Sequence, residues 1–196
     1  AMKRRETFGT SGPRIIPRFF GGWELPRDMC ERTDFAATGY KQGVPMGGDL
    51  PQSPETGQAP IFALNALRDS SEDGAPLQRI QVIKGWVDSE GQTHQAVYDV
   101  AGGDTGARVD PDTCAVSGTG YGQLCATWRD PDFDPSQAAV YYTRVLENPS
   151  CRWSRHDCLS LPEAKRPPSC VDPDLPWQIH ERAWTSPIWY QPGTVL

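Results

Sequence analysis

Residues 138–146 read AAVYYTRVL, and they form the strongest strand signal in the chain. Aromatic and β-branched residues dominate this stretch, and such residues favour a pleated, half-buried surface. Upstream of it, residues 79–87 alternate, with Ile80 and Val82 on one side and polar or small residues between them. A turn at residues 88–91 and a returning strand at residues 93–100 predict a β-hairpin.

Further strands are predicted on both sides of this hairpin, at residues 14–23, 60–67, 123–128 and 183–190. Pro187 places the last of these at a sheet edge or a bulge. Seven or eight strands with almost no amphipathic helix indicate a mostly β protein. The predicted fold is an antiparallel β-sandwich, immunoglobulin-like or jelly-roll-like, with long irregular loops. Two of these loops are expected at residues 24–60 and 148–176.

The composition agrees with a single domain rich in turns. The 196 residues include 19 Gly and 19 Pro, which are scattered along the chain and mark frequent turns. Hydrophobic residues make up only 37%, but seven Trp, six Tyr and six Phe offset this low share. Aromatic side chains bury the most area per residue, so the chain can form a core without depending on disulfides.

One local motif supports the sandwich class. Residues 134–138 form a turn, and Ala139, Tyr141 and Tyr142 follow it in an Ala-x-Tyr-Tyr pattern. This pattern resembles the tyrosine corner of immunoglobulin-like sandwiches. Thr143 stands where antibody domains have a cysteine, so the motif supports the class and nothing finer.

The charge of the chain argues against several partners. The formal net charge is -6, whereas nucleic acids and anionic membranes require clustered Lys and Arg. The basic residues 3–5 are too few to change this. No apolar run approaches the roughly 20 residues that span a bilayer. We therefore expect no nucleic acid partner and no membrane span.

Six cysteines indicate an oxidising compartment. They are Cys30, Cys114, Cys125, Cys151, Cys158 and Cys170. The even count and the absence of a C-x-x-C pair favour disulfides and a periplasmic or secreted location, the alternative being reduced thiols in a cytosolic core. Cys114 and Cys125 flank the glycine-rich turn at residues 117–122, which predicts a disulfide between them. The other four cysteines permit three pairings, and the sequence does not choose among them.

Motifs for independent catalysis are missing from the sequence. His94, His156 and His180 lie far apart, although distant histidines can still meet in a fold. There is no G-x-S-x-G nucleophile motif and no phosphate-binding glycine loop. The 25 acidic residues contain no spacing that singles out a carboxylate pair. We expect this chain to need no cofactor and to carry no catalytic residue.

Two weaker binding signals remain. Asp130, Asp132 and Asp134 are spaced as in calcium loops, but the glycine and distal Glu of such loops are missing, so a tight turn capped by Asp side chains is favoured. Among the seven Trp, Trp153 and Trp177 lie in polar, irregular stretches and are expected to be the most exposed. They offer a platform for a sugar, although packing in the core or an interface is the commoner use of Trp.

Several segments together resemble one known family. They are TSGPRI at 10–15, RFFGGW at 18–23, GVPMGGDL at 43–50, RIQVIKGW at 79–86, DPDFDP at 130–135, RWS at 152–154 and ERAWTSPIWY at 181–190. These segments resemble the C-terminal part of the bacterial family called domain of unknown function 3604. The matches run in order across nearly the whole chain. The most specific are residues 44–50 and the closing ten residues, 181–190.

The resemblance implies a larger parent protein. Members of this family are several times longer, look exported, and carry an N-terminal part like the polymerase-and-histidinol-phosphatase (PHP) type of metal-dependent phosphoesterase. The metal ligands of that part would lie upstream of Ala1, and none has a matching position here. Ala1 before Met2 is typical of a cloning remnant. The resemblance thus makes residues 1–12 the end of an upstream PHP-like domain and residues 13–196 the β-sandwich module.

The resulting functional hypothesis is a non-catalytic accessory module of a larger hydrolase, packed on the upstream domain of the same protein and shaping its site. The competing hypotheses are an independent module that binds a glycan or small ligand through exposed Trp or Tyr, and an independent enzyme. The residues predicted to form the docking or ligand face are Gly47, Gly48, Asp49, Glu181, Arg182, Trp153 and Trp177.

Overall fold

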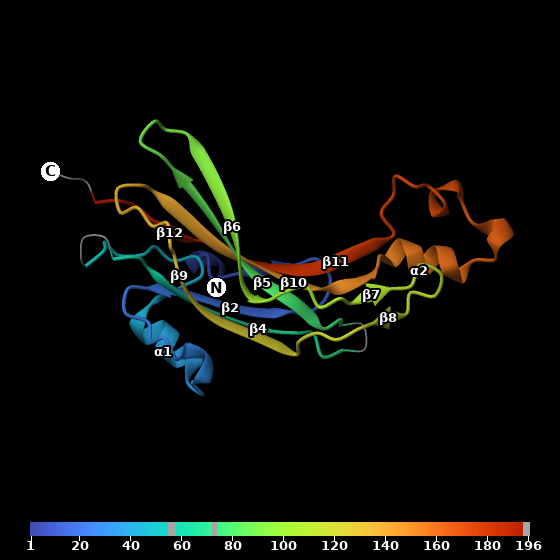
Figure 1. Cartoon of the computed structure of the whole chain (residues 1–196), viewed down its shortest axis with the longest axis horizontal. Coiled ribbons are helices and arrows are strands. Elements are labelled where there is room, and N and C mark those ends of the chain that lie inside the picture. The colour runs from blue at the N-terminus through green and yellow to red at the C-terminus, as the bar shows by residue number, and fades with distance from the viewer. Residues whose placement is uncertain (55–57, 72–73, 194–196) are drawn as a thin grey trace.

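Two antiparallel sheets pack against each other in the computed structural model, which describes residues 1–54, 58–71 and 74–193 (Figure 1). The predicted mostly β, antiparallel sandwich is confirmed. Its first sheet has the strand order β1-β11-β10-β5-β6, with β12 also paired to β10. These strands are β1 (Phe8–Thr10), β5 (Leu77–Val87), β6 (Thr93–Gly102), β10 (Ala139–Cys151), β11 (Gln178–Thr185) and β12 (Ile188–Tyr190).

The second sheet has the order β3-β2-β4-β9, and a separate two-stranded ribbon joins β7 and β8. These strands are β2 (Ile16–Gly22), β3 (Val44–Pro45), β4 (Ile61–Leu67), β9 (Gln123–Arg129), β7 (Arg108–Val109) and β8 (Val116–Ser117). The helical segments are η1 (Met2–Arg4), η2 (Met29–Glu31), α1 (Phe35–Gln42), α2 (Trp153–Ser160), η3 (Glu163–Lys165) and η4 (Pro168–Cys170).

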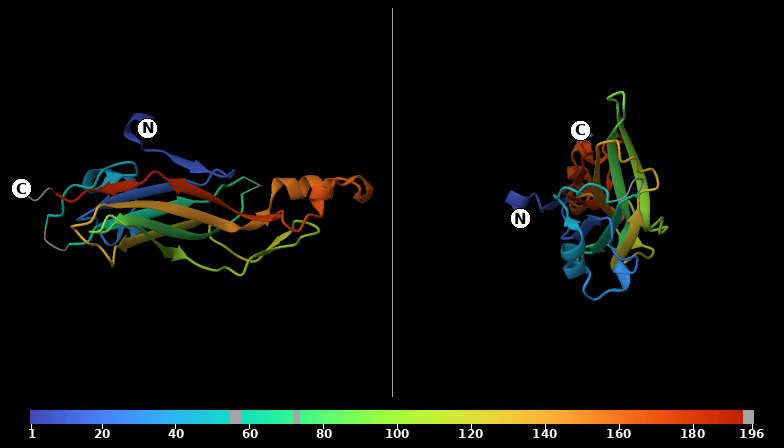
Figure 2. Two further views of the ribbon diagram at one scale, coloured as in Figure 1. Left: turned by 90° about the horizontal axis from the view of Figure 1, so that it is seen from above. Right: turned by 90° about the vertical axis from the view of Figure 1, so that its left-hand side faces the viewer.

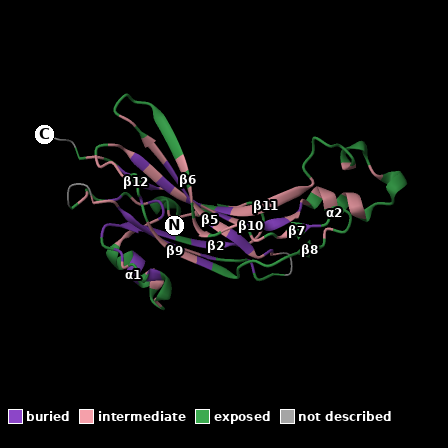
Figure 3. Ribbon diagram, in the orientation of Figure 1, coloured by how far each residue is buried: buried purple, intermediate pink, exposed green. Residues whose placement is uncertain are grey.

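The core lies between the two sheets and follows from the alternation seen in the sequence. Residues at every second position of β10 are buried, among them Tyr141 and Val145. Phe62 of β4 faces them across the core, with its ring centroid 4.5 Å from that of Tyr141 and 5.5 Å from that of Phe19. Figure 3 shows the buried residues gathered on these strands. The period of two therefore directs one face of each sheet inward.

A buried ion pair links the two sheets at one end of the core. The Nζ of Lys84, on β5, lies 2.6 Å from Oδ2 of Asp130, which directly follows β9. The hydroxyl of Tyr141 donates to the same oxygen at 2.7 Å. The tyrosine of the predicted corner thus bonds to a residue upstream of its strand, through the Asp130 side chain. Lys84 also donates to the carbonyl oxygen of Asp132 at 2.7 Å.

We predict that Asp130→Ala lowers the free energy of unfolding by about 3–5 kcal/mol, because it leaves the buried Lys84 ammonium unpaired. Asp132→Ala is the matched control. Its carboxylate is exposed and, among the residues that the structure describes, accepts a hydrogen bond from the Tyr98 hydroxyl alone, so its loss should cost about 1 kcal/mol or less. Urea denaturation of both variants measures their free energies of unfolding. Equal losses of stability in the two variants would contradict the assignment of Asp130 as the partner of the buried Lys84 ammonium.

Residues 24–60 are not the uninterrupted loop that we expected. They contain η2, α1 and β3, and a second, smaller cluster of buried residues lies beneath the two helices. Phe20 of β2 belongs to this cluster and packs on Gly39 of α1, where an added Cβ would lie 2.5 Å from the ring. α1 has only eight residues, too few for its periodicity to stand out in the sequence.

Residues 148–176 are also more regular than expected. β10 continues to Cys151, and α2 follows almost at once. Figure 2 shows that this segment projects from one end of the sandwich, whereas the N-terminal segment runs along one flank. Most of the projecting residues are exposed, so they carry no alternation from which the helix could have been predicted.

The predicted disulfide between Cys114 and Cys125 is wrong. The structure pairs Cys114 with Cys151, Cys30 with Cys125, and Cys158 with Cys170. The glycine-rich turn does not join two paired strands, because β8 pairs with β7 and β9 enters the second sheet beside β4. Leu124 and Ala126 face the core, so Cys125 points outward to Cys30 of η2.

We predict that a proteolytic digest without reductant yields the peptide pairs Cys30–Cys125, Cys114–Cys151 and Cys158–Cys170. Their Cα–Cα distances of 5.7, 5.6 and 5.6 Å are all suitable for a bridge. Mass spectrometry before and after reduction identifies the pairs. A Cys114–Cys125 peptide would contradict the strand order of the two sheets.

Candidate functional site

The residues predicted for docking or ligand binding lie along β11 and at its two ends. Glu181 and Arg182 belong to the strand itself. Beyond its C-terminal end, the amide of Gly47 donates to the carbonyl of Pro187 at 2.9 Å. At the other end, the amide of Arg152, next to Trp153, donates to the carbonyl of Trp177 at 2.9 Å. One strand therefore organises residues from three separate parts of the sequence.

The side chains of Glu181 and Arg182 lie on opposite faces of β11, because neighbouring residues on a strand point to opposite sides of the sheet. The Arg182 guanidinium lies 5.8 Å from the ring centroid of Trp184, and 37% of that tryptophan is exposed. Glu181 turns the other way, accepts a hydrogen bond from the Ser11 hydroxyl, and lines a cavity. The two residues do not form one charged patch.

The cavity beside Glu181 has a volume of about 720 Å³, and several charged and polar side chains line it. It lies where the end of β10, the start of α2 and the connection from β1 to β2 meet. The Cys114–Cys151 disulfide forms part of its wall. Side chains that can bind a ligand come from all three elements and from β11: Arg14, Glu147, Ser150, Trp153, His156 and Glu181.

Glu147 is the buried member of this set. It occupies a bulge, since Leu146 pairs with Arg182 and Pro149 with His180, which leaves Glu147 and Asn148 opposite the single residue Glu181. Glu147 is only 1% exposed, and its Oε1 has no hydrogen-bond partner among the described residues. Bulges of this kind often redirect a side chain at a functional site.

The surroundings of Glu147 favour its protonated form. Burial is the main cause and raises the pKa of its carboxyl to about 7, against the backbone amide of Ala75, which lowers it. The negative charges of Glu181 and Asp69 raise the pKa further. The Asp69 carboxylate has a lowered pKa instead, because the backbone amides of Arg14 and Ser71 donate to it. A buried carboxyl with one unpartnered oxygen and a raised pKa that lines a cavity is typical of functional sites.

Sequence analysis missed Glu147, although a signal existed. Tyr141, Thr143 and Val145 alternate inward along β10, and the same period puts Glu147 on the buried side. A charged residue at a position that alternation assigns to the core is informative, because burying an unpaired carboxyl costs free energy.

We predict that Glu147 makes the protein less stable as the pH rises. A pKa near 7 in the folded state exceeds the value of 4.5 for the unfolded chain. The folded state therefore keeps a proton that the unfolded state loses, and the stabilisation is lost between about pH 4.5 and pH 7. Glu147→Gln removes this dependence. Between pH 5 and pH 8 the free energy of unfolding of the unmodified protein should therefore fall by about 2.5 kcal/mol more than that of the variant.

Urea denaturation at both pH values measures this effect. Glu163→Gln is the control, because Glu163 is exposed on η3, away from the cavity. A Glu147→Gln profile parallel to that of the unmodified protein would show that Glu147 is ionised without cost.

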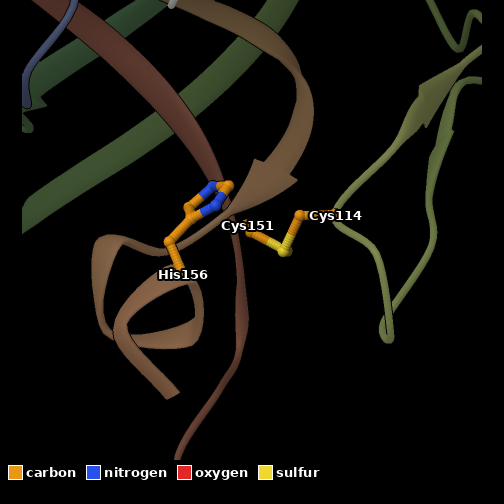
Figure 4. A group of neighbouring side chains, drawn as sticks. All are labelled: Cys114, Cys151 and His156. Carbon is orange, nitrogen blue, oxygen red and sulfur yellow. A yellow bond between two sulfur atoms is a disulfide. The ribbon is translucent and has the colours of Figure 1, made fainter. Parts of the chain in front are cut away.

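The one group of three close metal-ligand side chains among the described residues is Cys114, Cys151 and His156, whose donor atoms lie within 4.8 Å of one another (Figure 4). The two sulfur atoms are bonded to each other, so they offer no thiolate to a metal. His94 lies away from this group, in the β5–β6 hairpin, where its Nε2 is 2.6 Å from Oδ2 of Asp88. The ring of His180 contacts the carbonyl of Glu147 at 3.0 Å.

The three calcium candidates are each engaged by the protein. Asp130 pairs with Lys84, Asp132 accepts from Tyr98, and Asp134 accepts from the Ser136 hydroxyl and amide. Asp130 also accepts the backbone amide of Asp132. These contacts are those of a capped turn, and an ammonium group occupies the position beside Asp130 where a cation would bind.

Trp153 and Trp177 both line a second hollow, of about 430 Å³, within the projecting segment. Trp153 is 75% exposed, as its sequence context predicted, whereas Trp177 is partly buried. Apolar side chains from the loop after η4 share this hollow, among them Val171 and Leu175. Trp153 also lines the polar cavity of Glu147 and so lies at the boundary between the two.

These features define a disulfide-bonded antiparallel β-sandwich with a polar cavity beside β11. No helix among the described residues is both long and apolar enough to cross a bilayer. A family model described as "Protein of unknown function (DUF3604)" matches residues 1–192, so the chain belongs to that family. No curated protein and no solved structure matches this chain.

Proposed function

We propose that this chain is a non-catalytic accessory module of a larger DUF3604 protein. It docks through its β1 edge on an upstream domain of the metal-dependent hydrolase type. The observation that carries the proposal is the position of β1, which is the outermost strand of the first sheet and has only three residues. An edge strand presents unpaired backbone groups to which another chain segment can add.

The hydrogen-bond pattern identifies the backbone groups that face outward. The carbonyl of Thr7 accepts from Ser186, and the amide of Ser11 donates to Arg182. Because bonding alternates along an antiparallel strand, Gly9 also faces β11, whereas Phe8 and Thr10 point their amides and carbonyls away from it. These two residues therefore offer the edge for docking.

Exposed apolar side chains lie beside this edge. Phe8 is 47% exposed and lines a groove of about 160 Å³ together with Ile16 and Tyr40. Tyr40 donates a hydrogen bond to Glu6, which closes one side of the groove. An open edge next to an apolar groove suits a neighbouring domain better than it suits water.

The predicted docking residues near Gly47 hold the N-terminal segment in place. The Arg5 guanidinium lies 2.7 Å from Oδ2 of Asp49. Gly47 has a φ of +85°, and an added Cβ there would lie 2.2 Å from the carbonyl oxygen of Arg5. Only glycine permits this approach, so the segment before β1 has a defined path over the module.

The proposed setting is the periplasm or the extracellular space. The three disulfides support it, because such bonds persist in oxidising compartments. Within this setting the upstream domain supplies the metal chemistry, and the module supports that domain and shapes the entrance to its site.

We predict that the amides of Phe8 and Thr10 exchange with deuterium quickly in the isolated chain and slowly in the protein expressed from its full reading frame. Docking would bury them in new hydrogen bonds. Hydrogen exchange measured on both proteins tests this. Equal exchange at these two amides would contradict docking through β1.

A pair of proline variants separates docking from folding. Thr10→Pro removes an outward donor and should weaken association of the two parts with little change in the melting temperature of the isolated chain. Gly9→Pro removes a donor that faces β11 and should lower that melting temperature. Docking that survives Thr10→Pro would place the interface elsewhere.

The competing hypothesis, an independent glycan- or ligand-binding module, has one observation in its favour. This is the cavity that combines the Glu147 carboxyl with the exposed Trp153. Binding of a ligand in that cavity would not depend on docking through the β1 edge.

A further inference from the structure

We propose that the cavity lined by Glu147, Glu181 and Trp153 is a binding site for a neutral saccharide or similar polyol. The inference is independent of docking through β1. At about 720 Å³ the cavity is far larger than a metal ion requires and falls within the range of small-molecule sites.

The buried end of the cavity lacks one hydrogen-bond partner. Oε1 of Glu147 is buried and unpartnered, which is costly for a polar atom. A ligand hydroxyl corrects this in either protonation state, because it donates to a carboxylate and accepts from a carboxylic acid. A cation corrects it only when the carboxyl is ionised. A hydroxyl group therefore suits this carboxyl better than a charged ligand does.

The walls of the cavity add hydrogen-bond donors and acceptors, both charged and neutral, that are free to bind a ligand. The side chains of Arg14, Ser150 and His156 line the cavity and make no hydrogen bond within the described residues. Glu181 receives only the Ser11 hydroxyl. Guanidinium, hydroxyl, imidazole and carboxylate groups together match the alternating donors and acceptors of a sugar ring.

The rim supplies an aromatic surface. Trp153 begins α2 and is 75% exposed, so its indole is open to stack on the apolar C–H face of a sugar. The start of this helix is held firmly, since the Arg155 guanidinium donates to the carbonyl of Pro111 at 2.6 and 2.9 Å. The Cys114–Cys151 disulfide fixes the strand end next to it. A preorganised site of this kind loses little entropy on binding.

The test is saturation-transfer NMR with glucose, galactose, mannose, N-acetylglucosamine and their β-linked disaccharides, followed by titration of the tryptophan fluorescence. We expect at least one sugar to bind. Trp153→Ala and Glu147→Leu should each weaken that sugar about tenfold or more, and Glu147→Gln should have a smaller effect because an amide still accepts and donates.

Matched controls keep the result specific. Trp184→Ala removes a partly exposed tryptophan on the outer face of β11, and Glu163→Gln removes a carboxylate on η3, so both should leave binding unchanged. Melting temperatures confirm that each variant is folded. Glu147→Leu replaces the carboxyl by apolar atoms in a side chain of similar size, so loss of binding without loss of folding identifies the carboxyl.

Three outcomes would overturn the inference. The first is that no sugar of the set binds. The second is sugar binding that Trp184→Ala abolishes and Trp153→Ala does not, which would move the site to the outer face. The third is Ca²⁺ binding, measured by calorimetry, that Glu147→Leu abolishes while sugars fail to bind, which would make the cavity a cation site.

Discussion

The ion pair between Lys84 and Asp130 is the constraint on which the sandwich depends most directly. It joins the first sheet to the end of β9 in the second sheet, and Tyr141 adds a hydrogen bond from β10. Each charge is buried and would be costly alone, so only one relative position of the sheets satisfies both. Beside this ion pair, the ring of Tyr141 packs against that of Phe62 between the two sheets.

With the sheets held in this way, β11 becomes the strand on which functional features collect. Its outer partner β1 covers only three of its residues, Ala183 to Thr185 in register, and the cavity opens beside the uncovered part. Glu147 lies at the bulge opposite Glu181, and its side chain lines this cavity. One strand thus connects the proposed docking edge with the proposed sugar site, so a ligand in the cavity would lie next to any domain that adds to β1.

Much of the strand structure was predictable because it is local. Alternation in residues 79–87 and the aromatic pattern of residues 138–146 correspond to β5 and β10, which pair along most of their length. The candidate site was only partly predictable. Exposure of Trp153 followed from its polar context, but Glu147 was missed, and Cys114 was assigned to the wrong partner. The pairing of Cys114 is a contact between distant segments, which no local pattern describes. The burial of Glu147 continues the alternation along β10, and that local signal was overlooked.

By itself the sequence determined the class of the protein: a disulfide-bonded, mostly β chain of one family, with its longer strands near the predicted places. It did so because side-chain alternation and cysteine number are properties of short segments or of composition. The short strands β1, β3, β7 and β8 were not predicted, and the predicted strand 183–190 is divided between β11 and β12. Only the tertiary structure decided which cysteines pair and which buried carboxyl oxygen is left without a partner. It also brought Arg14, Glu147 and Trp153 to one cavity. These features depend on the order of strands in the two sheets, and that order is set by the packing of the whole core.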